Sequence, residues 1–247
     1  MRKRFCVLGL LFLGISSSSS AQPAADSLRR LLRQFPRQDT THAIRQIELA
    51  YRIFFVDPAQ AIALADSALA TNRRYRYIKG TGRAYHALGQ ALARKGRDAE
   101  AMDAYQNAFV LFEKVGDKRG WATTHAGMGQ LYERQRLIPQ ALDNYQKAYH
   151  LASETRFMRE TARNLARVAA IYNQYHHRSD TALLLLKRAM RENKDPYDTS
   201  LDSFIQHNIG YAYLSRKEYA IAKQYFEKAL QIAASKGLPE PMAAAYK

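Results

Sequence analysis

The sequence has a single cysteine, Cys6, among its 247 residues. Cys6 lies in an apolar segment, Phe5 to Ile15, whose 11 residues are too few to span a bilayer. A chain that loses this segment can form no disulfide, cysteine metal site or cysteine nucleophile. The sequence also lacks glycine-rich phosphate loops, the G-x-S-x-G nucleophile motif and the H-E-x-x-H zinc motif. It therefore predicts no catalytic residue and no cofactor.

Histidines are few and scattered, with one adjacent pair, His176 and His177, near Asp180. Neighbouring residues of a helix point to different sides, so this pair is poorly placed to share a metal ion. A solvated turn is the favoured interpretation, and a metal site is the weaker alternative. We predict no metal site.

The first residues have the order of a secretory signal. A basic start, Met1 to Arg4, precedes the apolar segment, and Ser16 to Ser20 lead to Ala21. We therefore expect residues 1–21 to be a signal peptide that is cleaved after Ala21, and the mature protein to be exported. An uncleaved N-terminal anchor is the alternative.

The chain is basic, with 38 lysines and arginines against 22 acidic residues and a formal net charge of +16. Loss of Arg2, Lys3 and Arg4 with the signal peptide lowers the charge to +13. Such a charge suits an acidic partner, nucleic acid or an anionic membrane. Export argues against nucleic acid. The basic residues are spread over most of the predicted helices, so a solvated basic surface is the alternative to an acidic partner.

A pattern of small and aromatic residues recurs along the chain. Its clearest copies are Ala101-x3-Tyr105-x2-Ala108, Ala141-x3-Tyr145-x2-Ala148 and Ala222-x3-Phe226-x2-Ala229. The leading alanines of all five copies are Ala61, Ala101, Ala141, Ala182 and Ala222, at steps of 40, 40, 41 and 40 residues. Twelve residues before four of these alanines lies another small residue: Gly89, Gly129, Ala169 and Gly210. A fixed period in this range indicates stacked helix pairs.

Together the two patterns resemble the tetratricopeptide repeat family, whose signature is W-x2-L-G-x2-Y followed by A-x3-F. The resemblance covers about residues 41–237. It implies an all-α fold, an α-solenoid of antiparallel helix pairs that forms a right-handed superhelix. The period of 40 exceeds the usual 34 and resembles that of the long-repeat subclass found in kinesin light chains.

The repeats divide the chain into four parts. We expect a signal peptide (1–21), a capping helix with a linker (22–40), five repeats of which the first is degenerate (41–237), and the start of a truncated sixth repeat (238–247). The predicted helix pairs are 41–54/58–74, 79–95/98–114, 119–135/138–154, 158–175/179–192 and 199–215/218–235. Gly116, Gly120 and Gly237 are expected to end the second helices. The glycines of the first helices are expected where the two helices of a repeat cross closely.

The resemblance also implies a peptide-binding groove lined by the first helix of each repeat. Carried over position by position, it assigns to this groove Arg83, His86, Gln90, Arg94, Thr123, Gln130, Glu133, Arg134, Arg163, Asn173, His207 and Tyr211. Arginine and glutamine suit hydrogen bonding to a peptide backbone or to carboxylates. The alternative is that these side chains are only solvated.

We therefore expect an exported, non-enzymatic scaffold that binds a protein or peptide, acidic if the charge is used. A secretion signal, a capping helix and long repeats are similar to the exported N-terminal sensor region of bacterial membrane-bound histidine kinases and related regulators. This resemblance implies a sensory role in the periplasm or at the periplasmic face of the inner membrane. The alternative is that the chain is the N-terminal fragment of such a kinase, tethered to the membrane by a C-terminal part outside this sequence. A stand-alone hydrolase is the least favoured reading because no nucleophile and base are visible.

Overall fold

The computed structural model describes residues 21–37, 39–193 and 199–235. Within them all regular structure is helical, with eleven α-helices and no strand. The predicted all-α solenoid is thereby confirmed. Residues 1–20 of the predicted signal peptide, Gly237 and the predicted start of a sixth repeat (238–247) lie outside the described residues.

The helices pair as the repeat pattern predicts. A first helix, α1 (Ala21–Gln34), precedes five pairs. These are α2 (Thr40–Ile53) with α3 (Pro58–Arg74), α4 (Ile78–Arg94) with α5 (Asp98–Lys114), α6 (Lys118–Arg134) with α7 (Ile138–Glu154), α8 (Met158–Gln174) with α9 (Ser179–Glu192), and α10 (Thr199–Ser215) with α11 (Tyr219–Ser235). Every predicted helix end of the five pairs lies within one residue of the observed end. We call the first helix of each pair helix A and the second helix B.

The 40-residue period follows from the helix and turn lengths. Two 17-residue helices and two three-residue turns, such as 95–97 and 115–117, make up one period. The step of 41 arises because the turn after α8, residues 175–178, has one residue more.

Most of these turns share one backbone conformation. The residue after the helix cap has a positive φ, as in Gly96 (76°), Gly116 (64°) and Arg156 (53°). The next residue then donates its backbone N–H to a carbonyl five residues earlier, as Asp117 does to Phe112 at 2.9 Å. This is the Schellman motif, which satisfies carbonyls at a helix end. Gly116 therefore lies in a turn, as expected. The expectation for Gly120 is wrong, because it belongs to the first turn of α6 and packs on Phe112.

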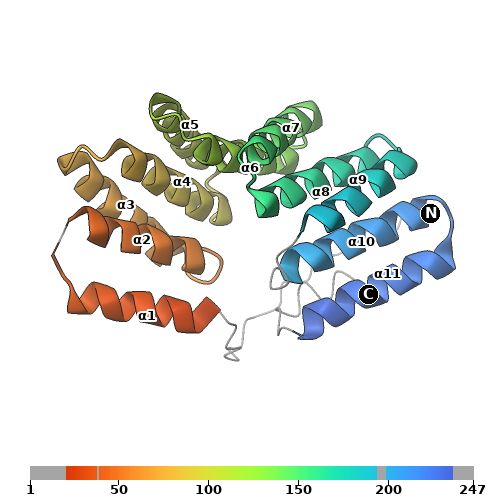
Figure 1. The fold of residues 1–247 in the computed structure, drawn as a ribbon, viewed down its shortest axis with the longest axis horizontal. Helices are drawn as coiled ribbons and strands as arrows, with labels where there is room; N and C mark the ends of the chain where they lie inside the picture. The colour runs from red at the N-terminus through yellow and green to blue at the C-terminus, as the bar shows by residue number, and fades with distance from the viewer. Residues whose placement is uncertain (1–20, 38, 194–198, 236–247) are drawn as a thin grey trace, which may run out of the picture.

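The helices form an arch with two layers (Figure 1). Consecutive A helices contact one another along the described chain, whereas no B helix contacts another B helix there. The A helices must therefore form the tighter, inner layer, and Figure 1 shows α6 inside α5 and α7. We call the concave side formed by α2, α4, α6, α8 and α10 the inner surface.

Residues of reciprocal size join helices A and B within each repeat. A Cβ on Gly89 would come within 2.8 Å of the Tyr105 ring, and one on Gly210 within 2.8 Å of Phe226. The glycines thus make room for an aromatic ring of helix B, which refines the expected backbone crossing. The five pairs, in chain order, are Leu49 with Ala65, Gly89 with Tyr105, Gly129 with Tyr145, Ala169 with Leu186, and Gly210 with Phe226. The first repeat departs from the signature because its large residue lies on helix A instead.

Helix α1 covers the N-terminal end of the stack. Its Leu28 and Leu32 pack against the cluster of buried residues formed by α2, α3 and α4. Phe35 lies just beyond the helix and is 54% exposed, and the Arg45 guanidinium lies 5.4 Å from the centre of its ring. This arrangement agrees with the predicted capping role of the segment.

Candidate functional site

The twelve groove residues predicted from the sequence all lie on A helices of the inner layer. Helix α4 carries Arg83, His86, Gln90 and Arg94, and helix α6 carries Thr123, Gln130, Glu133 and Arg134. Helices α8 and α10 supply Arg163, Asn173, His207 and Tyr211. Their contacts divide them into residues that hold the array together and residues that remain available.

Two of the twelve side chains are buried. His86 is 5% exposed, and its Nδ1 lies 3.0 Å from the hydroxyl of Tyr51, which also donates to the Arg83 carbonyl. Burial lowers the pKa of His86 to about 4, so the ring is neutral at pH 7. Asn173 is 3% exposed, and its Oδ1 accepts a hydrogen bond from the Ser179 hydroxyl. Both side chains join neighbouring helices in this conformation.

Arg134 and Glu133 also serve contacts between repeats. The Arg134 guanidinium donates to the Ala93 carbonyl at 2.7 Å and pairs with Asp98 at 2.5 Å, which ties α6 to the preceding repeat. Glu133 accepts a hydrogen bond from the Tyr145 hydroxyl at 2.7 Å and lies 3.7 Å from Arg167. Replacement of either residue would disturb packing as well as any ligand contact.

Three more of the twelve are partly engaged. The Arg94 guanidinium lies 5.1 Å from the centre of the exposed Phe55 ring. Arg163 pairs with Glu160 at 2.6 Å, and the Thr123 hydroxyl donates to the Gly120 carbonyl. Exposed cation–aromatic contacts of this kind contribute little, about 0.5–1 kcal/mol, so Arg94 can be recruited by a ligand.

Arg83, Gln90 and Gln130 form the available part of the surface, and we call them the arginine–glutamine patch. The half-buried Arg83 guanidinium has no ion-pair or hydrogen-bond partner among the described residues, although its backbone carbonyl is bonded. Gln90 follows two helical turns later on the same face, about 10 Å along the axis. Its buried Oε1 has no hydrogen-bond partner within the described chain, and Gln130 is exposed at the equivalent position of the next repeat. These are donors and acceptors that the described part of the protein leaves unused.

Arg167 also belongs to the inner surface, although the family positions do not include it. It lies four residues after Arg163, which places both on one helix face. Its guanidinium lies 4.8 Å from the centre of the Phe204 ring on α10. The i, i+4 spacing from Arg163 was the sequence signal that could have identified it.

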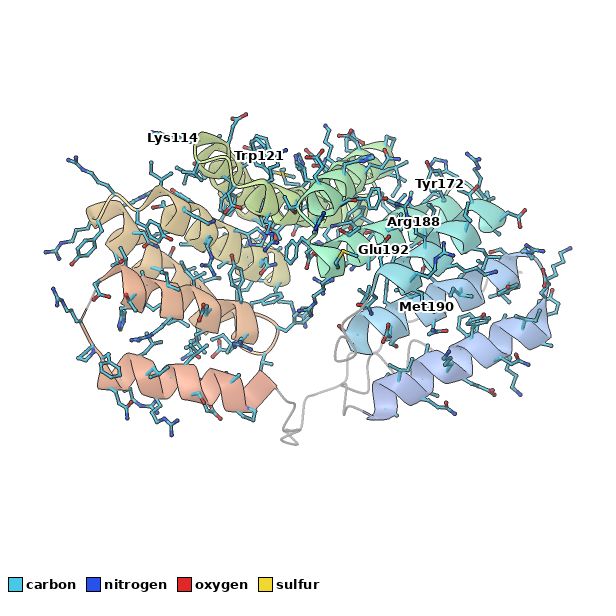
Figure 2. All side chains as sticks on the ribbon, viewed as in Figure 1. Lys114, Trp121, Tyr172, Arg188, Met190 and Glu192 are labelled. Atoms are coloured by element: carbon cyan, nitrogen blue, oxygen red, sulfur yellow. The ribbon has the colours of Figure 1, made fainter. Side chains whose placement is uncertain are left out.

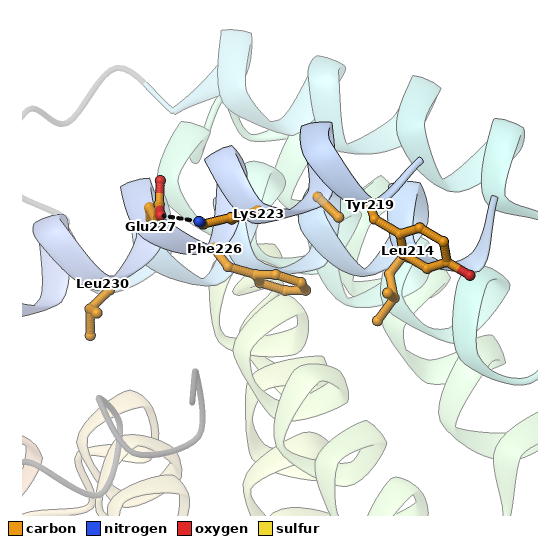
Figure 3. Close-up of a pocket in the computed structure, with 7 residues that line it drawn as sticks. Leu214, Tyr219, Lys223, Phe226, Glu227 and Leu230 are labelled. Carbon is orange, nitrogen blue, oxygen red and sulfur yellow. Dashed lines mark ion pairs between the residues drawn. The ribbon is translucent and has the colours of Figure 1, made fainter. Parts of the chain in front are cut away.

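The C-terminal end of the surface is aromatic. The ring of His207 lies 5.3 Å from Tyr211 and 5.4 Å from Phe226, measured between centroids, and burial lowers the pKa of His207. Beside them is a hollow of about 360 Å³ on α10 and α11, shown in Figure 3. Its lining is Leu214, Tyr219, Ala222, Lys223, Phe226, Glu227 and Leu230.

The His176–His177 turn lies at a second hollow, with Arg178, Asp180 and Arg216 in its lining. Arg216 pairs there with Asp180 at 2.5 Å and with Glu218 at 2.6 Å, so the hollow is a polar junction between repeats. The described residues contain no group of three or more histidines and acidic residues that could hold a metal ion. None of the described helices is both long and apolar enough to cross a bilayer.

Comparison with family models identifies the repeats. Residues 80–154 match one model described as a tetratricopeptide repeat, and residues 205–236 match another of the same description. These two segments are tetratricopeptide repeats. A comparison with curated protein sequences found no match.

Solved structures extend the likeness over most of the chain. BtubC (BKLC) from P. vanneervenii is 20% identical and superposes with a TM-score of 0.66, covering 87% of this chain and 89% of that one. A Rap protein complexed with Competence and Sporulation Factor is 11% identical, with a TM-score of 0.70 and coverage of 92% and 68%. The apo form of RapI is 13% identical, with a TM-score of 0.61 and coverage of 92% and 89%. At such identities the likeness concerns the fold alone, which is the tetratricopeptide repeat solenoid.

Proposed function

We propose that this protein is a binding scaffold that holds an acidic segment of a protein or peptide against its inner surface. Tetratricopeptide repeats stack without a catalytic cleft and present a long concave surface, which suits an extended ligand. The unpaired guanidinium of Arg83 is the observation that supports this proposal. No described carboxylate lies within ion-pair distance of it, so a ligand carboxylate would gain a charge-assisted pair without displacing one.

The two glutamines of the patch give the proposal its geometry. An extended peptide offers a backbone N–H and C=O at each residue, and a glutamine amide can both donate and accept. Gln90 and Gln130 lie at the same position of consecutive repeats, so a chain crossing from α4 to α6 meets both. The solved Rap protein of similar fold is a complex with a factor, which supports a binding role for such an array.

A peptide library displayed on phage tests this function with a defined probe. The purified protein should enrich sequences with Asp or Glu, and a synthetic peptide from the enriched set should bind in a fluorescence anisotropy titration. Arg83→Glu should weaken that binding roughly tenfold or more, because a charge-assisted hydrogen bond becomes a repulsion. Arg74→Glu makes the same charge change at an exposed residue of helix B and should leave the affinity unchanged.

Two results would count against the proposal. Equal affinity of the wild type and the Arg83→Glu variant would place the ligand elsewhere. Equal weakening in both variants would show that only the net charge matters. Circular dichroism of each variant keeps a loss of folding apart from a loss of binding. Arg134 is left intact because of its pairing with Asp98.

We also propose that the protein is exported and acts as the sensory part of a signalling system. Support comes from the order of basic, apolar and small residues in 1–21 and from the repeats that follow. An alkaline phosphatase fusion at residue 40, which is active only after export, tests the first point. An inactive fusion, or an N-terminal sequence of the purified protein that still begins at Met1, would count against export with cleavage.

A further inference from the structure

The C-terminal face of α11 is an exposed end of the stack. Phe226 is half-buried there beside the hollow of Figure 3. Its equivalents in the preceding repeats, Tyr105, Tyr145 and Leu186, are 2%, 0% and 0% exposed because the next helix A covers them. The same face includes Leu230, which lines the hollow.

The described junctions between repeats follow one register. The Phe109 ring of α5 lies 5.3 Å from His125 of α6, between centroids. The Met190 sulfur of α9 lies 3.5 Å from the amide nitrogen of Gln206 on α10. Each contact joins two residues that are 16 positions apart in the sequence. Trp121 adds a second contact, stacking on Phe109 at 6.0 Å where α5 meets α6 (Figure 2).

We propose that residues 242–246 dock on this face of α11, with Tyr246 against Leu230. Tyr246 is 16 positions after Leu230, the register of the junctions above. Met242 is 12 positions after Leu230, as Trp121 is after Phe109. Both residues that reach the face are thus large and apolar in the two places where the α5–α6 junction uses rings.

The occupant is this segment rather than a second copy of the chain. The contact continues an interface that the array already repeats, and only six residues, 236–241, separate the segment from α11. So short a connection gives the segment a high effective concentration at the face, of the order of millimolar. The hollow at Leu230 is then a repeat junction rather than a small-molecule site.

Cross-linking of paired cysteines tests the register. In a Cys6→Ser background, the pair Leu230→Cys with Tyr246→Cys is treated with a short bismaleimide. The pair Phe109→Cys with His125→Cys at the α5–α6 junction is the positive control. Leu230→Cys with Ala244→Cys is the negative control, since two residues turn a helix by about 200°. The 230/246 pair should cross-link within one chain as well as 109/125 does, and several-fold better than 230/244.

Equal yields for 230/246 and 230/244 would overturn the proposal. A 230/246 product that joins two chains, seen as a dimer on a denaturing gel, would also overturn it and assign the face to a second copy. Hydrogen exchange gives an independent readout without cysteines. Tyr246→Asp should raise the exchange of amides near Leu230 several-fold, whereas Ala244→Asp should not. Equal exchange in the wild type and the Tyr246→Asp variant would reject the docking.

Discussion

Reciprocal side-chain size sets the contact between the two helices of each repeat. Leu49 faces Ala65 in the first repeat, whereas Gly210 faces Phe226 in the fifth. Either order fills the same volume, which explains why the first repeat pairs normally although its sequence departs from the signature. Cores tolerate such exchanges when the total volume is kept.

Exchange of sizes in the fifth repeat should be compensating. Gly210→Leu alone forces a side chain against the Phe226 ring, and Phe226→Ala alone leaves a cavity, so each should destabilise by about 1–3 kcal/mol. The double variant should be more stable than the sum of the single effects by about 1 kcal/mol or more. Urea unfolding of the four proteins measures this interaction energy. Strictly additive effects would show that the two residues do not share one volume.

Buried histidine makes the array sensitive to acid. The pKa of His86 is lowered by burial to about 4 from an ordinary value of 6.5, so the native state binds fewer protons than the unfolded state between these values. This contribution to stability is full above pH 6.5 and is lost as the pH falls towards 4. Burial also lowers the pKa of His125 and of His207, which adds in the same direction.

The loss should be visible in unfolding at pH 7 and pH 5. The His86 contribution to the free energy of unfolding should fall by about 2 kcal/mol between these two values. His86→Gln keeps a partner for Tyr51 but removes the titrating group, so its stability should depend less on pH by about that amount. An equally steep pH dependence in the variant would mean that His86 is not buried neutral in the folded protein.

At the scale of helices and turns, sequence alone predicted the ends of the elements well. Asp57 caps α3 through the Gln60 backbone N–H, Pro58 starts that helix, and Gly116 follows the end of α5. These are local signals, carried by residues within one turn of the helix end. The inner helices and the face they present follow equally from the period.

The roles of the inner-surface side chains were not predictable in the same way. The sequence places Arg134 and Arg83 on the same face as candidates of one kind, yet Arg134 is paired with Asp98 and Arg83 has no such partner. Asp98 is 36 residues from Arg134, so the pairing depends on how two repeats stack. Contacts between repeats are set by superhelical geometry, which a single sequence does not state. The burial of His86 beneath Tyr51 has the same origin.

Turns occupied by arginine hold strain that glycine would relieve. Arg156 has a φ of 53°, and Gly116, at the equivalent turn 40 residues earlier, has a φ of 64°. A Cβ at Gly116 would touch nothing within 4 Å, so conformation alone distinguishes the two positions. Arg156→Gly should stabilise by up to about 1 kcal/mol, and Gly116→Ala should destabilise by a similar amount. Thermal unfolding measures both, and a Gly116→Ala variant as stable as the wild type would contradict the reasoning.

At the scale of the whole molecule, every contact between described helices is local. Each helix meets only its neighbours one or two places along the chain, and the arch of Figure 1 leaves its two ends joined through the intervening repeats alone. Stability should then spread along the array by nearest-neighbour coupling, which fades with distance. This distinguishes a solenoid from a globular domain, where a core change is felt throughout.

A charge placed at one end of the array should therefore loosen that end alone. Leu32 of α1 packs on the cluster formed by α2, α3 and α4, and Leu32→Asp puts an unpaired carboxylate into this contact. Amide hydrogen exchange should accelerate at least tenfold in α1 to α3, because local opening there becomes easier by more than 1.4 kcal/mol. Exchange in α8 to α11 should stay at the wild-type rate. Arg33→Asp, at the next and exposed residue, is the matched control and should change neither end. Uniform acceleration across all the described helices would show instead that the repeats unfold as one cooperative unit, with coupling strong enough to span the arch.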